Sequence, residues 1–568
     1  MSEIKKVKNE YIKEQSNGLR GTIKQELHDS ELNKFTKDNE QVLKFHGIYQ
    51  QDDRDKRKEL IKQKKDRLYS FMIRTKNPGG GNISPDQWEI LDEISTNWAN
   101  GTLRITTREC FQFHGIGKKN LWNAVNAMNS KLISSYGACG DINRNTVASP
   151  ISDLRSSYYY DASYLATEID KATLAKSKGY YEIWVDDEKY TTNINQKKIE
   201  KDDLYGENYL PRKFKIGVGH QSDNSIDVYT QDIGIIPIFS KDNELIGFNI
   251  LVGGGLGSHH NQAQTFPRLA DELGMCKNED HVIKVVRAIL MVQRNHGCRT
   301  NRKRARMKYL LEEWGVDKFR KEVERFLDFK LEKFIKFSIK EIDDFYGWHQ
   351  QPDKNKFFCG IFIENGRIGD TKKIKLKTGL KEIIKKFNIE TRLTATQDLI
   401  LVNIDKNDVD AIKELFEKYN IDTHEKYSSI KKMSMACPAL PTCSLAVAEA
   451  ERYLPKLLEQ LENMGYGNED IKIRMSGCPN SCSRPPVSEL GLIGATLGKY
   501  NIYLGGDHLG TRLNKLFMEL VEDEELPKVI SKLIDYWKDN RDSEIQRFGD
   551  FYNCQNFDNL KKNIIIQK

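Results

Sequence analysis

The order of segments along this 568-residue chain occurs twice, and this internal repeat constrains the fold more than any other feature of the sequence. The stretch Thr102–Gln112 resembles Glu390–Ile400, which lies 288 positions further on. The same offset pairs Ile73 with Ile361, and both of these apolar stretches run into turns that contain glycine. Each copy has the pattern of a strand, a turn, a helix and a second strand, which predicts a small α+β unit.

A second repeat lies further along the chain. Asp232–Ile235 resembles Glu489–Leu492 at an offset of 257 positions, and Phe248–Gly257 resembles Tyr500–Gly510 with one insertion. Four matches in the same order exceed what chance similarity between short apolar strands explains. We therefore predict an α+β fold built from a duplicated pair of modules in the order A–B–A′–B′.

The chain is long enough for several domains, because a single hydrophobic core stops growing near about 250–300 residues. The charged stretch Gln50–Arg57 predicts a solvated helix, in an N-terminal arm that can instead wrap another part of the molecule or a partner subunit. We expect this arm and four modules, with boundaries at residues 1–65 (arm), 66–148 (A), 149–345 (B), 346–424 (A′) and 425–568 (B′).

The composition excludes several classes of protein. A formal net charge of +7, spread over this length, predicts neither a nucleic-acid binder nor a membrane-surface protein. The N-terminal residues lack the apolar core of a secretory signal, and no apolar run approaches the roughly 18–20 residues that a membrane span needs. Six of the ten cysteines are scattered singly and show no disulfide framework, so we expect a cytoplasmic protein.

The other four cysteines form two close pairs near the C-terminus. Five residues separate Cys437 from Cys443, and three separate Cys478 from Cys482. Four thiolates from two proline-containing loops suit an iron–sulfur cluster, whose irons each need one soft ligand. Structural zinc sites usually space each cysteine pair by about two to four residues, so the five-residue gap favours a cluster over zinc.

Between the two pairs, leucines recur at helical spacing, which predicts a core-facing helix that brings both cysteine loops to one end. These leucines are Leu454, Leu457, Leu458 and Leu461. The run Gly253–Gly257 follows a predicted strand but lacks a complete dinucleotide-binding pattern, as does Gly505–Gly506. We interpret both glycine runs as tight backbone approaches, where the glycine backbone packs closely against its neighbours, rather than as a nicotinamide site.

Positive charge is concentrated in short segments flanked by predicted strands. Arg74 precedes a glycine turn, Arg108 follows a strand, and Arg144 lies between two asparagines. Lys213 and Lys215 are two positions apart in an extended segment and therefore face the same side. A single residue of this kind is usually a surface charge, but arginines embedded among apolar strand residues need an anion or a carboxylate as partner.

These residues resemble the sulfite and nitrite reductase family, in which siroheme is coupled to a [4Fe-4S] cluster. The resemblance rests on the two cysteine pairs and on Thr106–His114, Asn143–Asn145 and Leu210–Lys215, and it extends over nearly the whole chain. The stretch Phe45–Arg54 points to the branch of haemoprotein subunits that reduce sulfite with electrons from NADPH. The family has pseudo-twofold symmetry, which agrees with the duplicated modules.

The resemblance implies a role for each residue that matches the family's pattern. Those expected to hold the cluster are Cys437, Cys443, Cys478 and Cys482, and Cys482 would also bridge to the siroheme iron. Those expected to bind sulfite on the opposite side of the iron are Arg74, Arg144, Lys213 and Lys215. Those expected near the siroheme are Arg108, Gln112, Arg306 and Asn480, and His114 would have a packing or cofactor-proximal role.

The resemblance further implies a six-electron reduction of sulfite to sulfide. Because each oxygen that leaves as water needs protons, we expect proton delivery through Lys213 or Lys215 and ordered water. The chain has no nicotinamide or flavin motif, so NADPH would be used indirectly, through a flavoprotein (alpha) subunit in a hetero-oligomer. The N-terminal arm is the predicted docking segment for this partner.

Only B′ carries the cysteines, whereas in B the strand that corresponds to the approach to Cys478 carries Lys213 and Lys215. We therefore expect thiolates on one side of the siroheme and ammonium groups on the other. Two alternatives remain open. One is a ferredoxin-dependent sulfite or nitrite reductase on the same fold, and the other is a non-catalytic iron–sulfur electron carrier or a zinc-stabilised binding protein.

Overall fold

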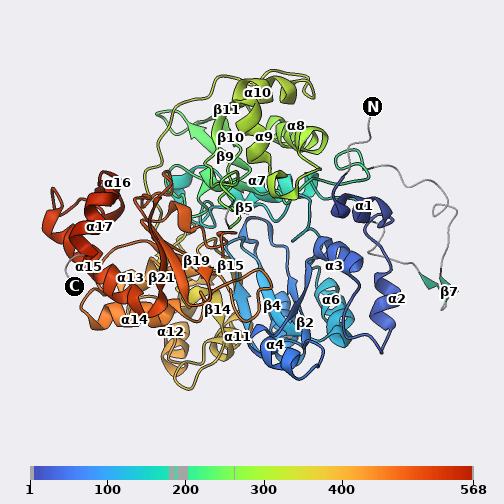
Figure 1. Cartoon of the computed structure of the whole chain (residues 1–568), viewed down its shortest axis with the longest axis horizontal. Coiled ribbons are helices and arrows are strands. Elements are labelled where there is room, and N and C mark those ends of the chain that lie inside the picture. The colour runs from blue at the N-terminus through green and yellow to red at the C-terminus, as the bar shows by residue number, and fades with distance from the viewer. Residues whose placement is uncertain (1–5, 178–183, 186–187, 190–201, 261, 566–568) are drawn as a thin grey trace.

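A computed structural model describes residues 6–177, 184–185, 188–189, 202–260 and 262–565, and all of the predicted site residues lie within these ranges (Figure 1). Modules A and A′ each build a sheet with the same strand order, β1–β2–β4–β3 in A and β12–β13–β16–β15 in A′. The strands of A are β1 (Ile48–Asp52), β2 (Tyr69–Arg74), β3 (Leu103–Ile105) and β4 (Phe111–Ile116). Those of A′ are β12 (Gly347–Gln350), β13 (Lys356–Ile361), β15 (Glu390–Leu393) and β16 (Leu399–Asp405).

The pairing within these sheets confirms the first predicted repeat. Arg104 of β3 lies opposite Gln112 of β4, and Arg392 of β15 lies opposite Ile400 of β16. Both members of the second pair are 288 positions beyond those of the first. The two modules are therefore structural copies with a common register in this part of the sheet.

The alignment of Ile73 with Ile361 is wrong by two residues. Ile73 pairs with Phe113, whereas the residue that pairs with the equivalent Leu401 is Cys359. From Ile73 to Arg104 the chain advances 31 positions, whereas from Cys359 to Arg392 it advances 33, so a single offset cannot fit both strands. The alternation of apolar residues, which repeats every two positions, made the shifted alignment look equally good.

The N-terminal segment is built into the fold. Its strand β1 pairs with β2 along the edge of the A sheet, and α1 (Lys8–Gln15) packs on module B, where Ile12 and Leu19 enter the core. The charged stretch after β1 forms α4 (Arg54–Lys62), in which no side chain is buried. Its first turn is capped by the Asp53 side chain, which accepts from two backbone N–H groups.

Modules B and B′ also share one sheet topology, with two parallel pairings followed by two antiparallel ones. In B the strands are β5 (Val147–Ala148), β8 (Ile216–Val218), β9 (Ile233–Phe239), β10 (Leu245–Val252) and β11 (Asp271–Cys276). In B′ they are β17 (Met435–Ala436), β18 (Ile473–Ser476), β19 (Leu490–Thr496), β20 (Lys499–Leu504) and β21 (Lys515–Glu522). Ile216 pairs with Ile233 and Ile473 with Leu490, which confirms the predicted offset of 257 positions.

Modules A and A′ share one hydrophobic core, whereas B and B′ each have their own. Helices α5 (Pro85–Asn97) and α11 (Leu376–Lys386) pack together in the common core, and Asp92 of α5 binds Lys381 of α11 at 2.7 Å. The short strand β14 (Arg367–Ile368) of A′ completes the A sheet beside β3. In Figure 1 the B helices lie at the top, B′ at the left and the A–A′ pair below them. Among the described residues, no helix has the length and apolar character needed to cross a membrane.

Candidate functional site

The two cysteine pairs lie on loops that leave neighbouring strands at the same edge of the B′ sheet. Strand β17 precedes the first loop, β18 precedes the second, and these strands are parallel. Parallel neighbours end at the same edge, so the loops start side by side. The predicted helix between the pairs is confirmed as α14 (Leu454–Asn463), with all four leucines buried. The strand pairing, however, is what brings the loops together.

The sulfur atoms form a mutually interacting group. Cys437 and Cys478 are buried, Cys443 is half-buried and Cys482 is exposed. Burial, together with the charges of Cys482 and Cys443, raises the pKa of the Cys478 thiol to about 11. Burial and the other three cysteines likewise raise the pKa of Cys437. Thiols that suppress one another's ionisation need a cationic centre among them to become thiolates, so the donor set fits the predicted cluster.

A zinc ion and a [4Fe-4S] cluster require different distances between their sulfur ligands. A zinc site needs four ligands within about 2.0–2.3 Å of one ion. No three His, Cys, Asp or Glu side chains of the described residues are grouped closely enough to hold such an ion. A [4Fe-4S] cluster takes one thiolate at each iron, and its four sulfur ligands therefore stand further apart. The preference for a cluster over zinc rests on the five-residue gap within the first cysteine pair.

Arg54, to which the sequence analysis gave no role of its own, holds the first cysteine loop. Its Nη1 donates to the carbonyl oxygens of Cys443, Ser444 and Ala446 at 3.1, 3.1 and 3.2 Å. Its backbone N–H donates to the carbonyl of Pro441 at 3.3 Å. Four contacts from one residue fix the backbone around Cys443. The contact joins segments 389 positions apart, so no local pattern could have predicted it.

A buried ion-pair network supports the same loop from the other side. The backbone N–H of Glu451 donates to the carbonyl of Cys437 at 3.1 Å, and its carboxylate accepts from Arg104 at 2.9 Å and from Arg367 at 2.7 and 3.0 Å. Arg104 also donates to the carbonyl of Ala436 at 3.0 Å. Although burial opposes ionisation, the two guanidinium groups lower the pKa of Glu451 to about 2.

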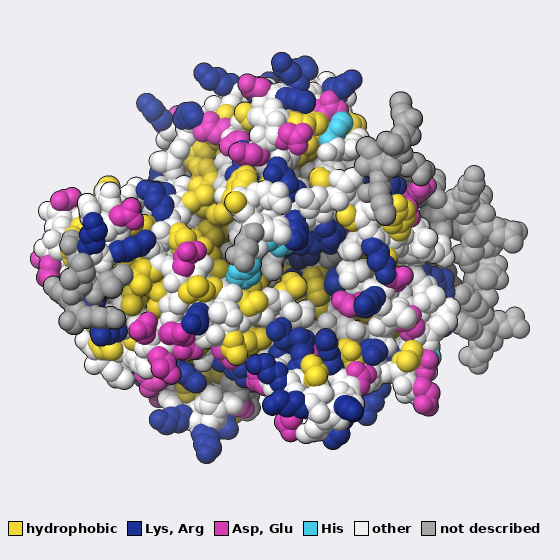
Figure 2. All heavy atoms as spheres, viewed as in Figure 1, with side chains coloured by type: hydrophobic (Ala, Val, Ile, Leu, Met, Phe, Trp, Pro, Cys, Tyr) yellow, Lys and Arg dark blue, Asp and Glu magenta, His cyan; other side chains and the backbone are white. Residues whose placement is uncertain are grey.

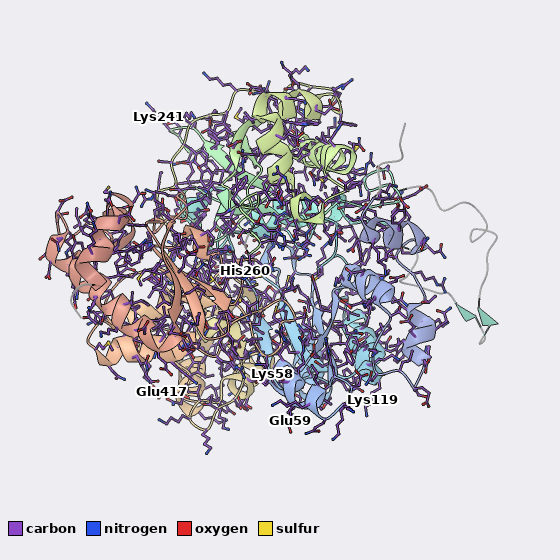
Figure 3. All side chains as sticks on the ribbon, in the orientation of Figure 1. Lys58, Glu59, Lys119, Lys241, His260 and Glu417 are labelled. Atoms are coloured by element: carbon purple, nitrogen blue, oxygen red, sulfur yellow. The ribbon has the colours of Figure 1, made fainter. Side chains whose placement is uncertain are left out.

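Replacing Glu451 by glutamine is expected to destabilise the protein at pH 7 and to weaken its sensitivity to acid. A carboxylate whose pKa falls from about 4.5 to about 2 on folding contributes about 3 kcal/mol above pH 4.5, and this contribution is lost as the pH falls from 4.5 toward 2. Urea unfolding at pH 7 and pH 3 measures the effect. Glu417→Gln, on the exposed surface in Figure 3, is the control. An equal loss of stability on acidification in Glu451→Gln and the parent would contradict the prediction.

Cationic side chains lie close enough to the exposed Cys482 to interact with its charge. Burial and the neighbouring arginines, Arg144 among them, lower the pKa of Lys213 to about 7, and the charge of Cys482 opposes this shift. Burial and nearby cations also lower the pKa of Lys215, again opposed by Cys482. Arg74 interacts with the same cysteine. Figure 2 shows Lys and Arg side chains gathered in the hollowed centre of this face, near His260, which is labelled in Figure 3.

Neighbouring groups orient the two arginines of this set. Gln112 of β4 pairs with Arg74 of β2, and its amide oxygen, when turned toward Arg74, accepts from Nη2 at 2.5 Å and from Nε at 3.1 Å. Arg144 donates from Nε and Nη2 to the carbonyl of Gly140 at 3.3 Å. His114, two residues beyond Gln112, is buried, and within the described residues neither ring nitrogen has a hydrogen-bond partner.

Most of the N–H donors of Arg108 and Arg306 form hydrogen bonds with other groups of the protein. Arg108 donates to Gln231 Oε1 at 2.6 Å and to a backbone carbonyl of β8 at 2.9 Å. Arg306 binds both carboxylate oxygens of Asp232, at 2.7 and 3.3 Å. One of these oxygens also accepts from the backbone N–H of Lys215 at 2.9 Å. Both arginines therefore fix the segment that carries Lys215, and their contact with siroheme stays a prediction.

Asn480 connects the second cysteine loop to a glycine run of module B. Its Nδ2 donates to the sulfur of Cys478 at 3.5 Å, and a Cβ at Gly257 would lie 3.3 Å from its carbonyl oxygen. A Cβ at Gly254, or at its equivalent Gly506, would come within 2.3 Å of a backbone carbonyl oxygen. Real Cβ atoms do not approach so closely, which confirms that both glycine runs are tight backbone approaches.

The expectation that lysines of B replace cysteines of B′ is wrong in its detail. Lys213 and Lys215 precede β8, whereas the second cysteine loop follows β18. At the offset of 257 positions, Lys215 corresponds to Lys472 and Cys478 corresponds to Gln221. The lysines thus lie at the opposite end of the equivalent strand. Both lysines nevertheless interact with Cys482 of the other module.

Two family models match the chain, each of them twice. The model described as nitrite and sulphite reductase 4Fe-4S domain matches residues 173–331 and 433–567. The model described as nitrite/sulfite reductase ferredoxin-like half domain matches residues 62–131 and 349–419. The order of the four matches is that of the predicted modules A, B, A′ and B′.

Known proteins resemble the chain along almost its whole length. The sulfite reductase [NADPH] hemoprotein beta-component of Staphylococcus haemolyticus is 43% identical over 547 residues, which cover 95% of this chain and 94% of the relative. The protein of the same name from Geobacillus thermodenitrificans is 42% identical over 550 residues, with the same coverage. The structure of Mycobacterium tuberculosis NirA has the same fold, with a TM-score of 0.76 at 22% identity and 97% coverage of both chains. The chain therefore belongs to the nitrite and sulphite reductase family, with duplicated ferredoxin-like half domains and a 4Fe-4S domain.

Proposed function

We propose that this chain is the haemoprotein component of an assimilatory NADPH-dependent sulfite reductase, and that it reduces sulfite to sulfide by six electrons. The observation that carries this proposal is the group of Arg74, Lys213 and Lys215, whose charges interact with the exposed Cys482 of the four-cysteine site. The curated relatives, which are named as such components, support the choice of substrate and electron source.

The proposed division of labour follows from the chemistry of the side chains. Cys437, Cys443, Cys478 and Cys482 would hold a [4Fe-4S] cluster, and siroheme bound beside Cys482 would supply the iron at which sulfite is reduced. On the other side, Arg74, Arg144, Lys213 and Lys215 would bind the sulfite anion and stabilise the negative charge that develops on its oxygens. Charge attraction of this kind grows as the effective dielectric falls, which suits the poorly solvated position of these residues.

Proton supply is assigned to the lysines. Each oxygen of sulfite leaves as water, so protons must reach it repeatedly. Lys213 has a pKa of about 7, and a group with this pKa exchanges its proton readily at neutral pH. Lys215 lies two positions away on the same side of the extended segment, so either ammonium group could pass a proton to a departing oxygen.

The proposed electron donor is a flavoprotein subunit that oxidises NADPH and assembles with this chain in the cytoplasm. The relatives' designation as a beta-component supports such a partner. Helix α4 of the N-terminal segment has no buried side chain, and Arg54 at its start contacts the Cys443 loop. A donor that docks on α4 would therefore lie close to one of the cluster ligands.

The test is a comparison of spectra and turnover in the purified protein. Siroheme and cluster should give a Soret band and about four non-haem iron atoms per chain. Reduced methyl viologen should support sulfite reduction, and NADPH should do so only when the flavoprotein is added. Faster turnover of nitrite than of sulfite, or stoichiometric zinc without iron, would overturn the proposal.

A further inference from the structure

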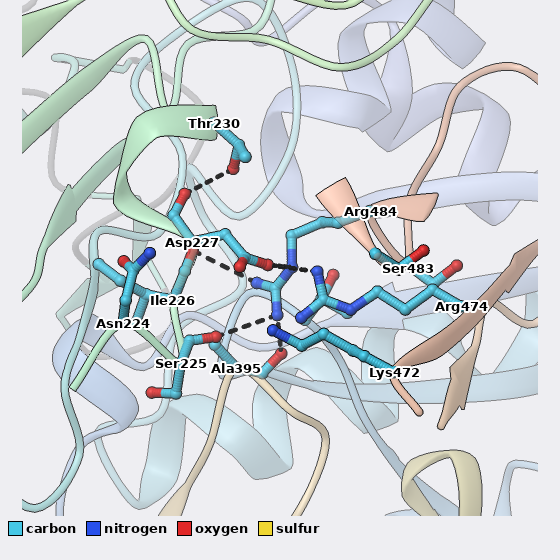
Figure 4. A network of polar contacts seen from close by, with 12 residues as sticks. Asn224, Ser225, Ile226, Asp227, Thr230, Ala395, Lys472, Arg474, Ser483 and Arg484 are labelled. Carbon is cyan, nitrogen blue, oxygen red and sulfur yellow. Dashed lines mark hydrogen bonds and ion pairs between the residues drawn. The ribbon is translucent and has the colours of Figure 1, made fainter. Parts of the chain in front are cut away.

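Two equivalent loops of B and B′ meet through a buried ion pair in the interior (Figure 4). Asp227 precedes the 3₁₀ turn η6 (Val228–Thr230), and Arg484 precedes the 3₁₀ turn η10 (Pro485–Val487). The two residues are 257 positions apart, so they occupy the same place in the two modules. Both adopt left-handed backbone conformations, with φ of 50° and 62°. Their contact therefore marks the pseudo-twofold axis.

Opposite charges make this meeting point favourable. Identical residues at the axis would bring two like charges together, whereas Arg484 Nε lies 2.7 Å from Asp227 Oδ2. Arg474 of β18 donates to the same oxygen at 2.5 Å. Asp227 has no exposed surface, and although burial alone would raise its pKa, the two arginines hold that pKa below its ordinary value. Removing Asp227 would leave two buried guanidinium groups without a carboxylate, whereas removing Arg484 would leave Asp227 paired with Arg474 alone.

Arg484 also binds backbone carbonyls from two other modules. Its Nη2 donates to the carbonyl of Ser225 in B at 3.1 Å and to that of Ala395 in A′ at 3.0 Å. Its Nη1 donates to the carbonyl of Ile226 at 3.4 Å. Ser225 is the residue of B that corresponds to Cys482 of B′. One guanidinium group thus ties the end of the second cysteine loop to its counterpart loop.

The backbone between Cys482 and Arg484 has little conformational freedom. Cys482 is two residues before Arg484, and the intervening Ser483 hydroxyl contacts the Ser476 hydroxyl at 2.7 Å. On the other side, the carbonyl of Cys482 accepts from Thr107 Oγ1 at 2.9 Å. The Cys482 sulfur is exposed, so its position depends on how its backbone is held.

We propose that Arg484 is a positioning residue for Cys482, and that its contact with Asp227 across the pseudo-twofold axis fixes this thiolate for the cluster and the siroheme. The inference rests on the proposed assignment of the four cysteines to a [4Fe-4S] cluster. Arg484 touches no reacting atom and acts through the backbone two residues away. Loosening this contact alters the environment of Cys482 while all four thiolates remain available.

The experiment compares Arg484→Met with the parent holoprotein. Substitutions that loosen the groups around metal ligands typically weaken metal binding by about 10–100-fold, so iron should be released to a chelator at least about tenfold faster. The electron paramagnetic resonance spectrum of the dithionite-reduced cluster and its midpoint potential should both change. Arg484→Lys keeps a charge beside Asp227 but loses the fork of donors, and it should give an intermediate rate. This milder variant carries the test if Arg484→Met does not fold.

Arg392→Met is the matched control. Arg392 is buried to the same degree as Arg484, binds the carboxylate of Asp153, and donates to the carbonyl of Pro150 at 3.0 Å, away from the cysteine loops. The Arg392→Met variant should lose stability, but its reduced-cluster spectrum, midpoint potential and iron-release rate should match those of the parent. Parent-like spectra and iron release in both Arg484 variants would overturn the inference. A parent protein that holds no cluster would instead overturn the proposed function.

Discussion

Replacing Cys478 by serine is expected to leave a folded protein that holds no intact cluster and reduces no sulfite above background. The thiol is buried, and its sulfur accepts from Asn480. A serine hydroxyl is a hard, weakly acidic ligand that replaces a thiolate poorly at iron. Without the cluster, electrons have no route to the substrate, so the loss of turnover should far exceed the loss of stability.

Iron and acid-labile sulfide per chain, together with turnover on reduced methyl viologen, measure this effect. Cys110→Ser is the matched control for cluster content, because Cys110 is also buried but donates to the carbonyl of Arg108 at 3.0 Å, a contact that a hydroxyl keeps. The control should retain the parent's iron. Full iron content in Cys478→Ser would show that this cysteine is not a ligand.

Replacing Lys215 by methionine is expected to lower kcat/KM for sulfite by about a hundredfold, the usual loss when one donor to a developing negative charge is removed. Methionine keeps most of the side-chain volume, so the pocket should stay filled. The Soret band and the reduced-cluster spectrum should match those of the parent. Lys241→Met, on the exposed surface (Figure 3), is the control and should leave turnover unchanged. Unchanged sulfite turnover in both Lys213→Met and Lys215→Met would contradict the proposed roles.

Lys213 adds a pH dependence to this prediction. Its pKa is lowered from 10.5 to about 7 by burial and the neighbouring arginines. The folded protein therefore binds fewer protons than the unfolded chain between pH 7 and 10.5, so this residue makes stability rise with pH in that window. In the proposed role, Lys213 binds sulfite in its ammonium form, so KM for sulfite should rise as the pH increases through 7. Lys213→Arg, which stays charged, should lack this rise.

Much of the fold could be predicted from the sequence because its two halves repeat. The pairing of Arg104 with Gln112 recurs in Arg392 and Ile400, and such a long-range match fixes a sheet register that local propensity cannot. The strand β1 was missed. It is a short edge strand with polar residues beside a charged helix, and its pattern is that of a solvated segment.

The site could be predicted where the chemistry is carried by spacing. The number of residues between the cysteines of each pair predicts a cluster, and this signal does not depend on the fold around them. Arg54, Glu451 and the Asp227–Arg484 pair could not be found in this way. Each acts on a segment far away in the chain, and an isolated Asp, Glu or Arg in sequence looks the same whether it is solvated or buried in an ion pair.

Because all of B lies between A and A′ in the chain, their common core cannot close during synthesis until Ile421 has left the ribosome. At about 5–20 residues per second, the 288 residues between equivalent positions take roughly 15–60 s to translate. Throughout that time Phe71, Ile73 and Leu103 have no partners from A′. The nascent N-terminal half therefore presents an unpaired apolar face, which makes it a natural substrate for chaperones that act during translation.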